Sequence, residues 1–375
     1  MKTFDVAIAG AGLIGGSIAW ELAGAGLRVA LFDRQEPGRE ASWAGAGILS
    51  PAPENPGMIA AVELGKASLA MYADFVARVE AASGQQAGFR PRGTVQALFS
   101  GNAREELSTI IALHHGLGLQ AEALSSEDAR ELEPALSPDL EAAVLRPGEA
   151  SVDNRALTQA VLEAARRNGV QVFPGVEVTS LCRAARRCTG FRAAGEEIAA
   201  RWTVIASGCY SAAIAGAEHY AAVKPAKGQM LSLRAPASKF ERVLWSDKVY
   251  LVPRNDGRIL AGATVEYVGF DKGLTAGAIE RLLAAAIELA PGLAQATIEE
   301  MWAGLRPDSP DHLPILGPAD PDGLLLATGH FRAGILLAPI TARLIREWIT
   351  LGSVSIPWER FSPLRFASAE AVRHQ

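Results

Sequence analysis

This sequence of 375 residues has few cysteines and histidines, and its apolar runs are short. The three cysteines, Cys182, Cys188 and Cys209, lack the Cys-x-x-Cys spacing of metal-binding motifs, which predicts idle thiols and no bound metal. An odd, small number of cysteines suits a reducing compartment. No segment reaches the about 18 uninterrupted apolar residues of a membrane helix, so we expect no integral membrane association.

The chain also carries little net charge. The net charge of −5 at pH 7 and the scattered basic residues argue against nucleic acid or an anionic membrane as the main partner. The uncharged stretch 6–20 is no convincing signal peptide, because it is rich in glycine, follows a single Lys2 and precedes no clean cleavage site. We therefore predict a soluble, cytoplasmic protein.

The chain is too long for one compact core, so two domains are expected. Apolar periodicity predicts helices over 17–25, 58–82, 125–132, 153–168, 276–290 and 335–349. It predicts strands over 4–9, 27–32, 89–99, 170–173, 176–181, 203–206, 250–254, 258–265 and 324–327. Strands alternate with helices at both ends and hairpin-like strands fill the middle. This order favours an α/β nucleotide-binding domain with an inserted antiparallel-sheet domain of α+β type.

A glycine-rich fingerprint, Gly10-x-Gly12-x-x-Gly15, follows the first predicted strand and opens a helix. In that context the glycines permit a tight turn and close backbone approach to a pyrophosphate, and the helix N-terminus supplies free N–H groups. Asp33 lies 21 residues after Gly12, at the end of the second predicted strand, where its carboxylate can bind ribose hydroxyls. Together these features predict a dinucleotide site.

A second glycine-rich turn, Gly329 to Gly334, precedes the last predicted helix. Two such turns at opposite ends of the chain suggest one large ligand held at two points. FAD is such a ligand, with its pyrophosphate at the first turn and its ring system at the second. The small-residue loop 42–49 can also let the backbone approach a flat ring. The sequence lacks a second Gly-x-Gly-x-x-Gly, which a nicotinamide-dependent dehydrogenase with two nucleotide sites would need.

These segments, with Val252-Pro253-Arg254 and the block from Trp302 to Pro307, resemble the D-amino-acid oxidase family of FAD-dependent oxidoreductases. Within that family the chain resembles the glycine oxidases of the thiamine pathway. The resemblance runs from Phe4 to about Ile349 and is loose over 82–151. It implies a Rossmann-like FAD-binding domain interleaved with a substrate domain. Residues 1–82, 151–220 and 305–375 form the first, and residues 83–150 and 221–304 the second.

The resemblance also implies which residues bind the cofactor. The pyrophosphate and ribose side comprises Gly10, Gly12, Leu13, Ile14, Gly15, Asp33 and Arg34, with Val178, Ser207 and Gly208 beside them. Ser42, Ala46, Gly47 and Leu49 border the flavin. Its pyrimidine edge is enclosed by Gly329, His330, Phe331, Arg332, Ala333, Gly334 and Ile335. The N-terminus of the following helix faces this edge and favours the negative charge that develops there on reduction.

Three residues are candidates for the substrate site. Arg306 lies in an apolar block, and its guanidinium can hold an amino-acid carboxylate through two parallel hydrogen bonds. The alternative is a salt bridge to Asp308 or Asp311. Tyr250 can join Arg306 on the carboxylate, or it is an ordinary half-buried sheet tyrosine. Arg332 either caps the site or lies at the surface.

By this resemblance the reaction is oxidative deamination of glycine, sarcosine or a small D-amino acid. Hydride transfer to the flavin gives an imine, which water hydrolyses, and molecular oxygen takes the electrons to form hydrogen peroxide. Positioning of the substrate and electrostatic stabilisation are expected to account for most of the rate acceleration. His330 is expected to pack or hydrogen-bond near the flavin without acting as a base. The sequence leaves open the preferred substrate and the formation of homo-oligomers.

Two positions depart from the pattern of glycine oxidases. Lys248 stands where a histidine is common, and Val265 where a methionine is common, so a charge near the entrance and a roomier pocket are expected. Sarcosine oxidases tether their flavin through a cysteine near the position of Met301. Because no cysteine lies there, we predict non-covalent FAD.

Two other functions share these motifs. A D-amino-acid dehydrogenase would pass the electrons to a quinone or another acceptor in place of oxygen. A catalytically silent FAD-binding subunit of a larger complex would have no need of Arg306 and Tyr250.

Overall fold

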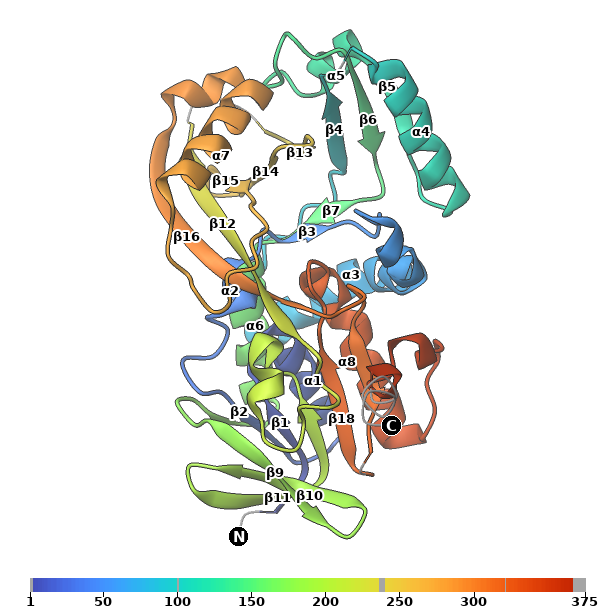
Figure 1. Cartoon of the computed structure of the whole chain (residues 1–375), viewed down its shortest axis with the longest axis vertical. Coiled ribbons are helices and arrows are strands. Elements are labelled where there is room, and N and C mark those ends of the chain that lie inside the picture. The colour runs from blue at the N-terminus through green and yellow to red at the C-terminus, as the bar shows by residue number, and fades with distance from the viewer. Residues whose placement is uncertain (1–2, 100, 236–239, 321, 367–375) are drawn as a thin grey trace, which may run out of the picture.

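The computed structural model describes residues 3–99, 101–235, 240–320 and 322–366. Its described residues form two eight-stranded sheets at opposite ends of an elongated molecule. Figure 1 shows the long strands β12 (Lys224–Arg234) and β16 (Thr297–Asp308) reaching from the upper sheet towards the lower one. A two-stranded ladder of β3 (Ile48–Leu49) and β7 (Ala150–Ser151) lies between them.

The lower sheet has a parallel centre in which β1 pairs with both β2 and β11. The strands follow one another in the order β17-β18-β11-β1-β2-β8, and β9 and β10 extend it from β11. Their bounds are β1 Thr3–Ala9, β2 Val29–Phe32, β8 Gln171–Phe173, β9 Val178–Ala184, β10 Arg187–Ala193, β11 Glu196–Ile205, β17 Ile315–Pro318 and β18 Leu324–Thr328.

Both faces of this sheet are covered, which explains why its strands read as continuous apolar runs. Val6 and Ile8 of β1 belong to the core beneath the helices, whereas Ala7 and Ala9 belong to the core on the opposite face. The helices on the first face are α1 (Leu13–Gly24), α3 (Val62–Ser83), α6 (Asn154–Arg167) and α8 (Gly334–Leu351). The hairpin of β9 and β10 contributes to the second face.

The upper sheet has the order β16-β12-β15-β14-β13-β4-β6-β5. Its remaining strands are β4 Thr94–Leu98, β5 Glu122–Ser125, β6 Ala142–Arg146, β13 Val243–Trp245, β14 Tyr250–Pro253 and β15 Arg258–Gly262. Alternate side chains of these strands face opposite ways, as the two-residue period of a strand requires. Leu231 and Leu251 pack with helix α7 (Ala276–Leu289), whereas Met230 and Val252 pack on the other face. This second face looks towards the lower sheet.

Most of the predicted elements are confirmed, with shifted ends. The strand predicted to reach Val265 ends at Gly262, and the helix predicted from Met58 begins as a 3-10 turn, Pro56–Ala61, before α3. Ser125 caps helix α5 (Ser126–Leu132) by accepting a hydrogen bond from the Asp128 N–H at 3.1 Å, as its spacing predicts.

Three long elements were not predicted. Strand β12 is buried on both faces over most of its length, so it lacks the alternation that marks a half-buried strand. Strand β16 begins among exposed residues and contains a proline. Helix α4 (Ala103–Gly116) buries only Ala103 and His114, so its apolar stripe is too weak to indicate a helix.

The division of the chain into two domains stays a prediction, and strand β16 runs across the predicted boundary at 304/305.

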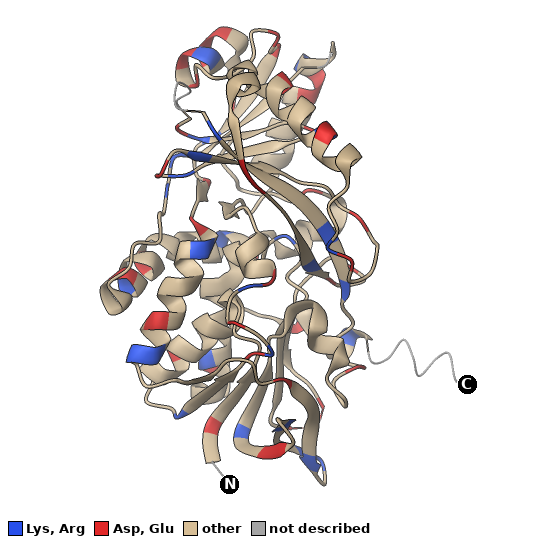
Figure 2. Cartoon of the chain, turned by 90° about the vertical axis from the view of Figure 1, so that its left-hand side faces the viewer, with Lys and Arg blue, Asp and Glu red and all other residues tan. Residues whose placement is uncertain are grey.

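Figure 2 shows basic and acidic residues interspersed along the ribbon. Among the helices in the described ranges, none combines the length and the apolarity that crossing a bilayer requires.

Candidate functional site

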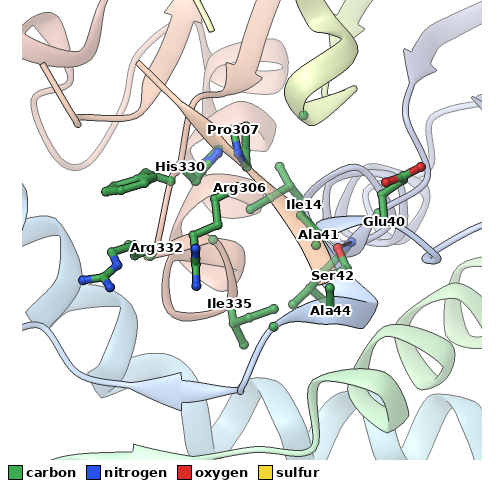
Figure 3. A pocket seen from close by; sticks show the side chains of 18 of the residues that line it. Ile14, Glu40, Ala41, Ser42, Ala44, Arg306, Pro307, His330, Arg332 and Ile335 are labelled. Carbon is green, nitrogen blue, oxygen red and sulfur yellow. Dashed lines mark hydrogen bonds between the residues drawn. The ribbon is translucent and has the colours of Figure 1, made fainter. Parts of the chain in front are cut away.

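A cavity of about 620 Å³ lies between the two sheets. This volume is in the range of pockets that hold cofactors and drug-sized ligands. Its walls come from the ends of β1 and β2, the segment 38–54 with helix α2 (Ala41–Ala44) and strand β3, the start of α8, and the inner face of the upper sheet. Figure 3 shows the Arg306 side chain in this cavity, with Arg332 on one side and Ser42 and Ala44 on the other.

The turn after β1 has room for glycine alone at two of its positions. Gly10 has φ +101°, and a Cβ there would lie 2.4 Å from the Ala206 carbonyl oxygen. A Cβ on Gly15 would lie 1.9 Å from the carbonyl oxygen of Gly10. The first contact brings the turn against the end of β11, and the second brings the start of α1 against the end of β1, so the fingerprint has a steric basis within the protein itself.

The same turn presents hydrogen-bond donors to the cavity. The Ala11 N–H donates to the Asp33 carboxylate at 2.8 Å, and the Leu13 N–H donates to the Ser42 hydroxyl at 2.8 Å. Within the described residues, the N–H groups of Gly12 and Ile14 have no recorded acceptor. Free N–H groups at a helix N-terminus favour an anion, as the predicted pyrophosphate would be.

Asp33 and Arg34 line the next part of the cavity. Asp33 accepts N–H bonds from Ala11 and from Gln35, yet burial raises the pKa of its carboxyl group. The Arg34 guanidinium lies 3.3 Å from the centre of the Tyr210 ring and pairs with Glu40 at 2.9 Å. Glu40 also accepts a hydrogen bond from Lys272 of the loop after β15, at 2.5 Å. One carboxylate therefore joins the two halves of the molecule beside the cavity.

The segment 42–47, called the loop 42–47 below, comprises the end of helix α2 and the turn after it, and is held by side chains from distant parts of the chain. Asn154 donates to the Ser42 carbonyl at 2.7 Å, and Arg254 donates at 2.8 Å both to the Ala46 carbonyl and to the Asn154 side-chain oxygen. Burial lowers the pKa of Arg254 to about 10, which still leaves it charged at neutral pH. Gly47 has φ +73°, and a Cβ there would lie 2.0 Å from the Val152 carbonyl oxygen. The loop is thus rigid and presents mostly small residues.

The second glycine-rich turn leads into helix α8. Phe331 adopts a left-handed φ of +47°, and its N–H donates to the Pro307 carbonyl at 2.9 Å. His330 is almost fully buried, bonds to the Thr341 hydroxyl at 3.1 Å, and has its pKa lowered by burial to about 4. It is therefore neutral at physiological pH. The first residues of α8, Gly334 and Ile335, line the cavity.

These observations fit the predicted FAD. The cavity has helix N-termini at two places, a carboxylate near the first and a stretch of small residues between them. The chain would hold the pyrophosphate at the turn before α1 and the flavin between the loop 42–47 and the start of α8.

Arg306 sits on the inner face of the upper sheet. Its Nη1 donates to the Thr264 carbonyl at 3.1 Å, and its guanidinium lies against Gly228 of the neighbouring strand β12. Tyr250 also lines the cavity, and burial raises the pKa of its hydroxyl while the nearby Arg306 opposes this shift. The Tyr250 hydroxyl is therefore a neutral donor beside a cation.

Arg306 differs from the other arginines that line the cavity. Arg34, Arg39, Arg146 and Arg332 each have a carboxylate partner, namely Glu40, Glu36, Glu149 and Glu54. No carboxylate partner is recorded for Arg306 in the described part of the chain. Its positive charge is therefore available to a ligand.

The alternative partners considered for Arg306 are otherwise engaged. Asp308 accepts hydrogen bonds from the Tyr267 hydroxyl and from His312, each at 2.7 Å. Asp311 pairs with Arg365 at 2.9 Å. The salt-bridge interpretation of Arg306 is thus wrong. Arg332 is neither a free surface residue nor an open cation, because it lines the cavity and pairs with Glu54.

Nearly all the predicted site residues line this cavity. Gly15, Leu49 and Gly329 do not. Gly15 packs against Gly10, and Leu49 is fully buried in the core below the cavity. Gly329 has φ +66° and packs against Ile315, so it shapes the turn without facing the cavity.

The inferences from Lys248 and Val265 are wrong. Lys248 points outward and pairs with Glu288 at 2.8 Å, and Val265 is exposed, so neither residue charges or widens the cavity. Met301 is exposed as well and does not line the cavity. The cysteine that does line the cavity is Cys209, and burial raises the pKa of its thiol to about 12.

Several cavity residues escaped the sequence analysis. They include Glu54, Gln96, His114, Arg146, Gly228, Trp245 and Met230. Most come from segments without a recognisable motif or from strand β12, which was not predicted. Arg146 and His114 lie in the region where the family resemblance is loosest, and no local signal marks them.

A family model described as "FAD dependent oxidoreductase" (DAO) matches residues 5–348. The bifunctional protein ThiO/ThiG of Synechocystis sp. is 36% identical over 371 residues, which are 97% of this chain and 54% of that protein. The chain thus spans about half the length of this relative. The glycine oxidase of Pseudomonas aeruginosa is 35% identical over 348 residues, 91% of this chain and 93% of that enzyme.

Solved structures are similar over the same extent. The crystal structure of glycine oxidase from Geobacillus kaustophilus matches with a TM-score of 0.92 at 30% identity. The match covers 97% of this chain and 99% of that one.

Proposed function

The chain belongs to the DAO family of FAD-dependent oxidoreductases, and on this premise we propose that it deaminates glycine or another small amine or amino acid oxidatively. Sarcosine and small D-amino acids are the other candidate substrates. With a primary amino acid the overall reaction converts the amino acid, oxygen and water into a 2-oxo acid, ammonia and hydrogen peroxide; with sarcosine the amine released is methylamine. The proposal rests above all on Arg306, a cavity arginine with no recorded carboxylate partner among the described residues.

In this proposal Arg306 and Tyr250 bind the substrate carboxylate. The Thr264 carbonyl takes one N–H of the guanidinium, and Gly228 lets the guanidinium lie against β12. A bidentate pair with a carboxylate uses two of the four remaining donors, and the neutral Tyr250 hydroxyl adds a third hydrogen bond to the carboxylate. Holding the carboxylate in this way fixes the direction of the α-carbon, which is the main contribution that the chain makes to the rate.

When bound, the cofactor would accept a hydride from the α-carbon and pass the two electrons on to molecular oxygen, which forms hydrogen peroxide. The N-terminus of α8 favours negative charge at the adjoining edge of the cavity. His330 keeps this edge free of a titrating charge because it is buried and neutral. Arg332, paired with Glu54, closes one side of the cavity. An assignment to the thiamine pathway stays a prediction.

The test is peroxide production by the FAD-loaded protein in air with glycine, sarcosine and a panel of D- and L-amino acids. Peroxide led by glycine or sarcosine would support the proposal. Flavin that bleaches and stays bleached in air would indicate a dehydrogenase with another electron acceptor. Flavin that never bleaches with any of these compounds would contradict the proposal.

The role of Arg306 has its own test. Arg306→Lys keeps the positive charge but loses the planar guanidinium that can form two parallel hydrogen bonds. We therefore expect kcat/KM to fall by about 10- to 100-fold, chiefly through a higher KM. Arg166→Lys, an exposed position on α6, is the matched control. Full activity of the Arg306→Lys variant at wild-type KM would remove Arg306 from the site.

A further inference from the structure

The upper sheet has an irregular stretch beside the candidate substrate site. Met230 of β12 pairs with Gly262, the last residue of β15. Further along, Lys227 pairs with Glu266. Between these two pairs lie two residues of β12 but three residues, 263–265, of the other segment. An extra residue on one side is a β-bulge, which bends a strand and re-aims its groups next to functional sites.

The side chain of Thr264 replaces a backbone acceptor in this bulge. Its hydroxyl accepts a hydrogen bond from the Gln229 N–H at 2.9 Å and donates one to the Glu266 Oε1 at 2.5 Å. The Thr264 carbonyl is left to accept the hydrogen bond from the Arg306 Nη1 at 3.1 Å. Because the hydroxyl acts as both acceptor and donor, Thr264 is held in one orientation, and the carbonyl that Arg306 uses is held with it.

Glu266 is itself fixed by several bonds. Its N–H and its carbonyl exchange hydrogen bonds with the backbone of Lys227, at 2.9 and 2.8 Å. Its Oε1 also accepts a hydrogen bond from the Gln229 side chain at 2.9 Å, and its Oε2 lies 3.8 Å from the Lys227 ammonium group. Burial acts to raise the pKa of Glu266, but the hydrogen bonds from Thr264 and Gln229 outweigh it and lower that pKa. The carboxylate is therefore ionised and can only accept.

Glu266 and the Arg306 guanidinium lie on opposite faces of β12. Gly228 lines the cavity and contacts the guanidinium. Its neighbour Gln229 points to the other face, as the alternation along a strand requires, and bonds there to Glu266. Gln229 is fully buried, so water does not replace these bonds. Neither Glu266 nor Thr264 lines the cavity, and Glu266 can therefore influence a ligand only through Arg306.

We propose that Glu266 is a positioning residue for substrate binding, which acts through the Thr264 hydroxyl to fix the carbonyl that orients Arg306. The arginine comes from β16, crosses β12 at Gly228 and ends at this carbonyl. Two parallel hydrogen bonds to a carboxylate require a defined orientation of the guanidinium plane. This inference rests on the proposed function, because it takes the substrate carboxylate to lie at Arg306.

Propionate, a carboxylate without an amine, tests the inference independently of turnover. Its Kd for the FAD-loaded protein is measured by calorimetry and by the change in flavin absorbance. Thr264→Val should raise this Kd about tenfold, because the buried Gln229 N–H then competes with Arg306 for the same carbonyl. Glu266→Leu should act alike. The double variant should be no worse than either single variant, because both changes break one link. The Kd for FAD should stay within about twofold of the wild-type value.

Conservative variants separate positioning from a general loss of structure. Thr264→Ser keeps the hydroxyl and Glu266→Gln keeps an acceptor oxygen, so each should bring the propionate Kd back to within about threefold of the wild-type value. Thr275→Val is the matched control. The Thr275 hydroxyl accepts a hydrogen bond from the same Gln229 side chain at 3.1 Å, outside the bulge. This variant should bind propionate as the wild type does. If Glu266→Leu does not fold, the comparison of Thr264→Val with Thr264→Ser decides.

Each outcome bears on the inference. If Arg306→Lys loses propionate while Thr264→Val binds it normally, only this inference is overturned. If Thr264→Val weakens FAD and propionate equally, the bulge is merely structural and the inference is again overturned. If the wild type does not bind propionate, or Arg306→Lys binds it normally, the carboxylate site and both proposals fail. If Thr264→Val and Glu266→Leu lose propionate but no amino acid bleaches the flavin, the positioning role stands and the proposed oxidation fails.

Discussion

A Cβ on Gly228 would lie 2.4 Å from both terminal nitrogens of the Arg306 guanidinium. The two residues lie on adjacent strands, where Gly228 pairs with Gly304 and Arg306 with Ala226. The absence of a side chain at Gly228 thus sets where the arginine lies. A methyl group there would push the guanidinium off the strand and away from the Thr264 carbonyl.

Gly228→Ala is therefore expected to raise KM for the amino-acid substrate about tenfold or more, with FAD content unchanged. The physical cause is displacement of a charged hydrogen-bonding group, which costs about 1.5–3 kcal/mol. Steady-state kinetics together with the flavin absorbance of the purified protein measures both effects. Gly277→Ala, an exposed position on α7, is the control and should behave like the wild type. An unchanged KM in Gly228→Ala would show that Arg306 does not hold the substrate in this position.

Arg254 is expected to determine FAD affinity without touching substrate. Arg254→Met removes the bonds to the Ala46 carbonyl and to Asn154, so the loop 42–47 loses a charged anchor. The expected cost is about 1.5–3 kcal/mol, or 10- to 100-fold in the Kd for FAD. Quenching of FAD fluorescence on titration with apoprotein measures this Kd. Arg234→Met, at a surface pair with Glu299, should leave it within about twofold.

His330 is expected to make the free energy of unfolding depend on pH without affecting catalysis. Its folded-state pKa of about 4 lies below the unfolded value of about 6.5, so the unfolded chain binds more protons between these values. Stability is therefore expected to rise with pH from about 4 to 6.5 and to level off above that, with up to about 3 kcal/mol at stake. Urea unfolding at several pH values should show a smaller rise in His330→Gln, because glutamine does not titrate. An equal rise in both proteins would assign it to other groups.

The flavin is expected to be bound without a covalent link. Cys209 is the cysteine lining the cavity, and a pKa near 12 leaves about one thiol in ten thousand ionised at pH 8. Acid precipitation should leave the yellow colour in the supernatant, and Cys209 should resist iodoacetamide until the protein is unfolded. A yellow pellet that turns colourless in Cys209→Ser would contradict this prediction.

The glycine positions show how far local sequence determined the cofactor site. Gly15 is required by its contact with Gly10 inside one strand-turn-helix unit, and such a unit has a recognisable spacing, whereas the close neighbour of Gly10 is the distant Ala206. Asp33 follows the next strand at the spacing typical of such a unit, so its place beside the turn could also be predicted from the sequence. The apolar runs likewise revealed most of the lower sheet, because burial on both faces leaves a continuous signal in short parallel strands.

Only the tertiary structure decided which charges are paired. Arg306 and Arg332 look alike in sequence, yet Glu54 pairs with Arg332, while no partner is recorded for Arg306 in the described ranges. Such pairings join residues far apart in the chain, so no local spacing encodes them. The same holds for His114 and Arg146, which a helix and a sheet strand bring to one end of the cavity. Local sequence therefore predicted the cofactor site, whereas long-range packing determined which cavity arginine has no recorded carboxylate partner among the described residues.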